Sequence, residues 1–121
     1  VEAAIRELSS ARGLRPEGLV AASGPHIREC CFEVKDDVAV PFRERFGDSV
    51  VHRQPSGRLT ISLASALRQL LTRAGIPGGS IDLSETCTFC DPARFFSYRR
   101  AKGQERGRLG SFIARRGEKA T

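Results

Sequence analysis

The chain has 121 residues, of which 40% are hydrophobic and 28% charged, and its net charge is +6. This length allows one domain with a hydrophobic core, and the composition excludes an intrinsically disordered chain. It contains no run of about 18 apolar residues and no basic-then-apolar leader, so we expect a cytoplasmic protein without a membrane-spanning segment.

The amino-terminal third predicts one helix and two strands. Apolar residues at helical spacing begin at Val1, and Gly13 is a natural end for this helix. The apolar run from Leu19 to Ser23 is bounded by glycines and predicts a buried strand. A second strand is predicted from Cys30 to Val34. Because the chain opens within an apparent helix and contains no methionine, we expect it to be part of a longer protein.

The middle third alternates helices with short strands. Asp36 or Asp37 is expected to cap a helix that ends at Phe46. A second helix, with a continuous apolar stripe, is predicted from Ser62 to Ala74. The strands predicted around these helices are Ser49 to His52, Leu59 to Ile61 and Ser80 to Leu83.

The last third is rich in basic residues. A polar hairpin tip is expected around Gly103 to Gly107, followed by a final strand from Leu109 to Ile113 and a frayed basic tail from Arg115 to Thr121. Strands that alternate with helices predict an α/β domain, a layered mixed sheet with flanking helices, spanning residues 1–121.

The four cysteines allow three interpretations. Cys87 and Cys90 have the C-x-x-C spacing of a zinc site, and Cys30, Cys31 or His26 could complete the ligand set. However, neighbouring cysteines on a strand would point to opposite faces, which argues against a shared ion. A redox pair at Cys87 and Cys90 is the second interpretation, and buried reduced thiols are the one that we favour.

The basic carboxyl end also allows several interpretations. It is expected to be an ordinary solvated face, while one or two of its arginines could bind an anion. We do not expect a nucleic-acid partner. His26 and His52 have no nucleophile or acid at a recognisable spacing, so we expect both to be solvated or hydrogen-bonded.

Four segments resemble a known family in order and spacing. The helix SLASALRQLLTRAGI (62–76) and the later GRLGSFI (107–113) accompany two segments that carry the family's signature residues. The first is GPHIRECCFEV, with Gly24, Pro25, Cys30, Cys31 and Glu33 at family positions, and the second is TCTFCDPARFFSYRR, which carries Cys87, Cys90, Phe95, Phe96, Ser97, Arg99 and Arg100. Together they resemble the carboxyl-terminal half of the laccase-domain family, also called polyphenol-oxidase-like proteins. The resemblance covers nearly the whole chain.

This resemblance implies a partial laccase-domain fold and a purine nucleoside phosphorylase that also deaminates adenosine. The partners implied are purine nucleosides and phosphate. The family's catalytic zinc is held by two histidines and a cysteine in segments that would precede Val1, so we expect no catalytic residue and no metal ligand in this chain. The older polyphenol oxidase label implies copper, to which we give less weight.

Guanidinium groups are natural stabilisers of the charge that develops on phosphate and purine. Arg99 and Arg100 are the candidates, with Ser97 as a hydroxyl partner. The alternative from a different functional class is a non-catalytic interaction domain whose basic carboxyl end docks an acidic partner.

Overall fold

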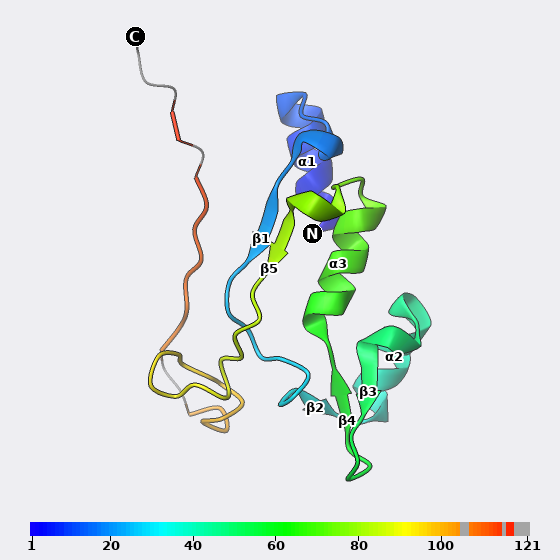
Figure 1. Cartoon of the computed structure of the whole chain (residues 1–121), viewed down its shortest axis with the longest axis vertical. Helices are drawn as coiled ribbons and strands as arrows, with labels where there is room; N and C mark the ends of the chain where they lie inside the picture. Colours follow the sequence, from blue (N-terminus) through cyan, green and yellow to red (C-terminus); the bar gives the residue numbers. More distant parts are fainter. Residues whose placement is uncertain (105–106, 115, 118–121) are drawn as a thin grey trace.

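A computed structural model describes residues 1–104, 107–114 and 116–117 and contains two small sheets (Figure 1). Strand β1 (Ala21–Ser23) pairs in parallel with β5 (Ile81–Leu83). Strands β2 (Glu33–Val34), β4 (Leu59–Ile61) and β3 (Val51–Arg53) form an antiparallel sheet with β4 in the centre. Parallel and antiparallel pairing with flanking helices confirms the predicted α/β class.

Three α-helices flank the sheets: α1 (Glu2–Arg12), α2 (Asp36–Phe46) and α3 (Leu63–Arg73). Short 3₁₀ turns precede β1, β3 and β5, at Pro16–Gly18, Asp48–Val50 and Gly78–Ser80. Among the described residues, no helix is long and apolar enough to cross a bilayer.

The hydrophobic core lies where α1 and α3 pack beside the β1–β5 pair (Figure 1). Ile5 from α1 and Leu71 from α3 meet Ile81 of β5, and Ile76 in the connecting loop completes the cluster. Burying each such side chain contributes about 1.5 to 3 kcal/mol. This cluster therefore anchors β1 and β5, whose carboxyl ends lead into the cysteine loops.

Helix α3 begins as predicted, directly after the buried end of β4. The hydroxyl oxygen of Ser62 accepts a hydrogen bond of 3.2 Å from the Ser65 backbone N–H, which makes Ser62 the N-cap. This cap satisfies a donor that the first turn of any helix leaves free. For α2 the expected aspartate cap is wrong, because Lys35 occupies the cap position without a side-chain bond.

Five of the six predicted strands differ from the structure, and those predicted from Leu19 and Ser80 begin at Ala21 and Ile81. The strand predicted from Ser49 begins at Val51, because Asp48–Val50 form a 3₁₀ turn. Only Glu33 and Val34 of the predicted strand from Cys30 to Val34 are extended and paired. Residues 109–113 are irregular, and they have no strand partner within the described part of the chain.

The carboxyl-terminal segment instead packs through side chains, since a methyl group built on Gly24 would overlap the Ser111 hydroxyl. In Figure 1 this segment runs upward on the β1 side of the molecule. Parts of two predictions lie outside the described residues: positions 105–106 of the hairpin tip, and positions 115 and 118–121 of the basic tail.

Candidate functional site

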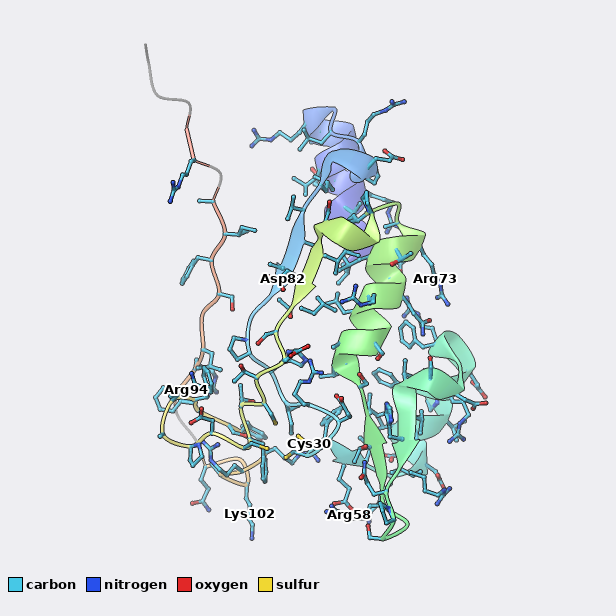
Figure 2. The ribbon with its side chains drawn as sticks, in the orientation of Figure 1. Cys30, Arg58, Arg73, Asp82, Arg94 and Lys102 are labelled. Carbon is cyan, nitrogen blue, oxygen red and sulfur yellow. The ribbon has the colours of Figure 1, made fainter. Side chains whose placement is uncertain are left out.

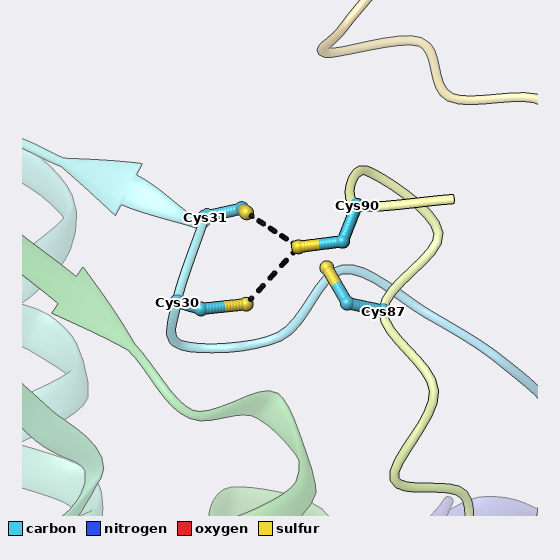
Figure 3. Close-up of side chains that lie close together, drawn as sticks. All are labelled: Cys30, Cys31, Cys87 and Cys90. Atoms are coloured by element: carbon cyan, nitrogen blue, oxygen red, sulfur yellow. Dashed lines mark hydrogen bonds between the residues drawn. The ribbon is translucent and has the colours of Figure 1, made fainter. Parts of the chain in front are cut away.

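The four cysteines converge from two loops (Figure 3). Cys30 and Cys31 lie in a tight turn, and Cys87 and Cys90 lie at the two ends of another. Their four Sγ atoms are all within 4.8 Å of one another. The Sγ of Cys90 lies 3.3 Å from that of Cys31 and 3.7 Å from that of Cys30. These are the described residues that could together hold a metal ion.

The expectation that Cys30 and Cys31 point to opposite faces of a strand is therefore wrong. The carbonyl oxygen of Arg28 accepts hydrogen bonds from both Cys31 N and Phe32 N, at 2.9 and 2.8 Å. These bonds close a turn, and a turn does not alternate its side chains as a strand does. Both thiols consequently face the same loop, as Figure 3 shows.

The two cysteine loops continue the parallel pairing of β1 and β5. His26 and Cys87 form an isolated parallel bridge in which Thr88 N donates to His26 O at 3.0 Å. Before that bridge, Ser84 N donates to the Ser23 hydroxyl at 3.0 Å. The thiols therefore lie just beyond the carboxyl ends of two paired strands, which is a common position for binding sites in α/β proteins.

Arg28 fastens the same two loops together. Its guanidinium donates to the Ser84 carbonyl at 2.6 Å, and its backbone N–H donates to the Cys87 sulfur at 3.4 Å. Both atoms belong to the loop after β5, so Arg28 fixes the position of the Cys30–Cys31 turn relative to Cys87.

The thiols have different proton affinities. Partial burial raises the pKa of Cys30 to about 11, although the hydrogen bond to Cys31 acts against this rise. Partial burial raises the pKa of Cys31 further, and hydrogen bonds to Cys90 and Cys30 add to it. Burial also acts to raise the pKa of Cys87, but backbone N–H groups of Arg28, Cys90 and Phe89 outweigh it and bring the pKa to about 7. Without a cation, the cluster can thus hold a thiolate at Cys87 while Cys30 and Cys31 stay protonated at neutral pH.

A polar cleft adjoins the cysteines. It consists of a hollow of about 410 Å³ and a second of about 210 Å³, which share Arg28, Glu29 and Glu85. The first hollow is also lined by Cys30, Cys87 and Gln54. The second hollow extends to the start of α3, and its other polar lining residues are His52, Ser62, Ser65 and Arg68.

Glu29 is the unusual group in this cleft. Its Oε2 atom lies 3.5 Å from Arg28 Nε, yet it is buried and has no hydrogen-bond partner among the described residues. A buried carboxylate oxygen without a hydrogen bond is costly, and it can accept one from a ligand. Arg28, Glu29, Glu85 and Arg68 were not among the site residues predicted from the sequence. The available signal was that Glu85 follows a predicted strand by two residues and Glu29 directly precedes another.

The predicted phosphate-binding residues lie elsewhere. Arg99 and Arg100 form part of a turn rather than a strand. The Arg100 guanidinium donates to the carbonyls of Thr88, Phe89 and Phe95 at 2.8, 3.1 and 2.6 Å. Buried Ser97 accepts a hydrogen bond from the backbone N–H of Arg100. None of the three lines the polar cleft, and their role in phosphate binding stays a prediction.

Arg99 is the exposed member of the pair. Its guanidinium donates to the Glu33 carbonyl at 2.7 Å and lies 5.2 Å from the centre of the Phe32 ring. Other residues shared with the family pack locally: the Glu33 carboxylate accepts from Arg58, Phe96 packs on Gly107, and Gly24 on Ser111. Gly24, Pro25, Phe95 and Phe96 do not line the cleft.

Figure 2 places Cys30 between the segment that carries Arg94 and the β2–β4 region that carries Arg58. The cysteine loops thus join the two sheets, and the polar cleft opens along this junction.

Comparison with known proteins agrees with the resemblance. The profile of a family described as multi-copper polyphenol oxidoreductase laccase matches residues 1–116. The chain is 38% identical over 108 residues to the purine nucleoside phosphorylase YlmD of Geobacillus stearothermophilus, a match that covers 87% of this chain and 39% of the relative. It is 35% identical over 116 residues to the adenosine deaminase RL5 of an unknown prokaryotic organism, which covers 93% of this chain and 44% of the relative.

Solved structures show the same relationship. The crystal structure of the hypothetical protein YfiH of Bacillus licheniformis superposes with a TM-score of 0.76 at 33% identity, covering 85% of this chain and 40% of that one. The chain therefore spans less than half the length of these relatives. On this extent of similarity in sequence and fold, the chain belongs to the multi-copper polyphenol oxidoreductase laccase family.

Proposed function

We propose that this chain is the carboxyl-terminal portion of a longer, cytoplasmic purine nucleoside phosphorylase. The observation that carries the proposal is the 38% identity over 108 residues with a relative of that name. The relative named adenosine deaminase supports a second activity at the same site, the release of ammonia from adenosine. The four cysteines are free thiols, and thiols stay reduced in the cytoplasm, which supports the proposed location.

In the proposed reaction, a phosphate oxygen attacks C1′ of the nucleoside ribose. The bond from C1′ to the purine nitrogen breaks, and its electron pair leaves with the purine, which takes up a proton. Adenosine, inosine and methylthioadenosine are the proposed substrates. The products are the free purine and a ribose 1-phosphate, or its methylthio derivative.

The polar cleft supports a polar ligand of this class. Arg28 and Arg68 offer positive charge, while the buried Glu29 oxygen lacks a hydrogen-bond donor. Nucleosides carry hydroxyl and amine donors that could satisfy it. We assign the cleft to nucleoside binding on this basis.

The described residues do not supply the metal site that the family resemblance implies. That site requires two histidines and a cysteine, whereas the group of potential ligands found among the described residues contains four cysteines and no histidine. We therefore propose that the catalytic zinc is held by residues upstream of Val1.

The test is an assay of the gene product that includes any residues encoded before Val1. We expect phosphate-dependent release of hypoxanthine from inosine, and ammonia from adenosine. A pure, folded, zinc-loaded product that releases no base at saturating phosphate would refute the proposal.

Within that assay, Arg99→Ala and Arg100→Ala should give unequal losses. Arg99 is exposed, whereas Arg100 is occupied by three carbonyl oxygens. We expect Arg99→Ala to raise the KM for phosphate. If the KM is unchanged in both variants, the phosphate role of this pair is lost while the assignment as a phosphorylase stands.

The alternative of an interaction domain rests on the basic carboxyl end. Several of those residues, at positions 106, 115 and 119, lie outside the described part of the chain. Among the basic residues that the structure describes, Arg94 forms an ion pair of 2.5 Å with Asp91. This is an ordinary ion pair at the surface of the protein.

A further inference from the structure

We propose that Cys30, Cys31, Cys87 and Cys90 bind one structural zinc ion. This centre differs in ligands and position from the catalytic zinc that the family resemblance implies, and the inference does not depend on the proposed enzymatic activity.

The distances between the sulfur atoms fit such an ion. Four thiolates around zinc, with bonds of about 2.3 Å, place their sulfurs about 3.8 Å apart at the corners of a tetrahedron. Here one pair is 3.3 Å apart, another is 3.7 Å, and all lie within 4.8 Å. Side-chain rotations that move each sulfur by no more than about 1 Å would bring all four to bonding distance.

The surroundings of Cys87 resemble those of a metal-bound thiolate. Its sulfur accepts hydrogen bonds from the backbone N–H group of Arg28 and from those of Phe89 and Cys90 within its own C-x-x-C turn. Such bonds orient a metal ligand and stabilise its negative charge. Zinc suits an all-thiolate set of this kind, and four protein ligands leave no open position, so the ion would be structural.

A disulfide is the competing use of the same sulfurs. The sulfurs of Cys31 and Cys90 lie 3.3 Å apart. A bond between them would leave Cys30 and Cys87 either as free thiols or as a second disulfide, and each disulfide needs a two-electron oxidant. Zinc uses all four thiols and needs no oxidant, which is why we favour it.

The first test is metal content. The full chain, purified under reducing conditions after expression with zinc, should retain one zinc ion per chain after dialysis against a weak chelator. X-ray absorption at the zinc edge should show four sulfur neighbours at about 2.3 Å. Cobalt substituted for zinc should give the intense absorption of tetrahedral cobalt bound to thiolates.

The variants make the test specific. Cys87→Ser and Cys90→Ser should each abolish retention of the ion. His26→Gln is the matched control, because His26 forms the backbone bridge to Cys87 and lies outside the four-cysteine group. Its Nε2 is buried and has no hydrogen-bond partner among the residues that the structure describes. This variant should keep one zinc and the full cobalt spectrum.

Several results would overturn the proposal. One is a reduced, folded wild-type chain that takes up neither zinc nor cobalt, or that binds iron in place of zinc. Another is an absorption spectrum that shows nitrogen or oxygen among the neighbours of the zinc ion. Loss of the ion from His26→Gln, or a mass that shows a disulfide in protein made in the cytoplasm, would also overturn it. Because the wild-type measurements need no variant, a cysteine variant that fails to fold does not decide the outcome.

Discussion

The guanidinium group of Arg100 connects its own turn to the C-x-x-C turn and to the end of the turn at residues 91–95. Its three carbonyl partners belong to Thr88, Phe89 and Phe95, and the first two lie within the C-x-x-C turn. Hydrogen bonds from a charged donor are stronger than neutral ones, and leaving half-buried carbonyls without donors carries a further cost. Arg100 therefore fixes the geometry of the Cys87 to Cys90 turn from outside the cluster.

We predict that Arg100→Ala lowers the free energy of unfolding by about 2 to 4 kcal/mol, because three acceptors lose their donor. Arg99→Ala is the control, and its exposed contacts should account for less than about 1 kcal/mol. Urea unfolding monitored by circular dichroism measures both. Equal effects of the two substitutions would contradict the assigned role of Arg100.

Helix α3 connects both sheets, since it follows β4 directly and its inner face packs on β5. Leu71 is buried within the cluster formed with Ile5, Ile76 and Ile81. Thr72, the next residue, is exposed. The stability of the helix should therefore depend strongly on the face that a residue occupies.

Leu71→Ala should cost about 2 to 5 kcal/mol, from lost transfer energy and the cavity left behind. Thr72→Ala on the exposed face should change stability by less than about 0.5 kcal/mol. Thermal unfolding of the two variants and the wild type provides the comparison. A small effect of Leu71→Ala would show that this cluster is not the main core.

Elements with strong local signals could be predicted from the sequence. The serine cap and apolar stripe of α3 and the strand Leu59–Ile61 were predicted within a residue. The turn at Cys30 and Cys31 could not, because it depends on one carbonyl, that of Arg28, accepting two bonds. The meeting of the two cysteine pairs depends on β1 pairing with β5, a contact across about 60 residues that no local pattern reveals.

At the scale of the whole molecule, the carboxyl-terminal segment is held by close packing at two glycines. A methyl group on Gly107 would overlap the ring of Phe96, and one on Gly24 would overlap the Ser111 hydroxyl. A hydroxyl can rotate away more easily than a ring. Gly107 is consequently the more restrictive of the two contacts.

Gly107→Ala should loosen the segment after it, because overpacking costs about 1 to 3 kcal/mol. Trypsin cleavage after Arg108 should become roughly fivefold faster, the factor that corresponds to about 1 kcal/mol. Gly117→Ala, where the added methyl group meets nothing within 4 Å, should leave the rate unchanged. Identical rates in all three proteins would mean that Phe96 does not hold the segment.

The sulfurs of Cys30 and Cys90 are 3.7 Å apart although 60 positions separate them along the chain. An ion shared by these two residues would close the intervening polypeptide into a ring that contains α2, α3, the whole antiparallel sheet and β5. By the chain-entropy relation for cross-links, a ring of this size restricts the unfolded state by about 4 kcal/mol. A backbone cut at the exposed turn 55–57 would then leave two fragments that migrate together until a chelator separates them.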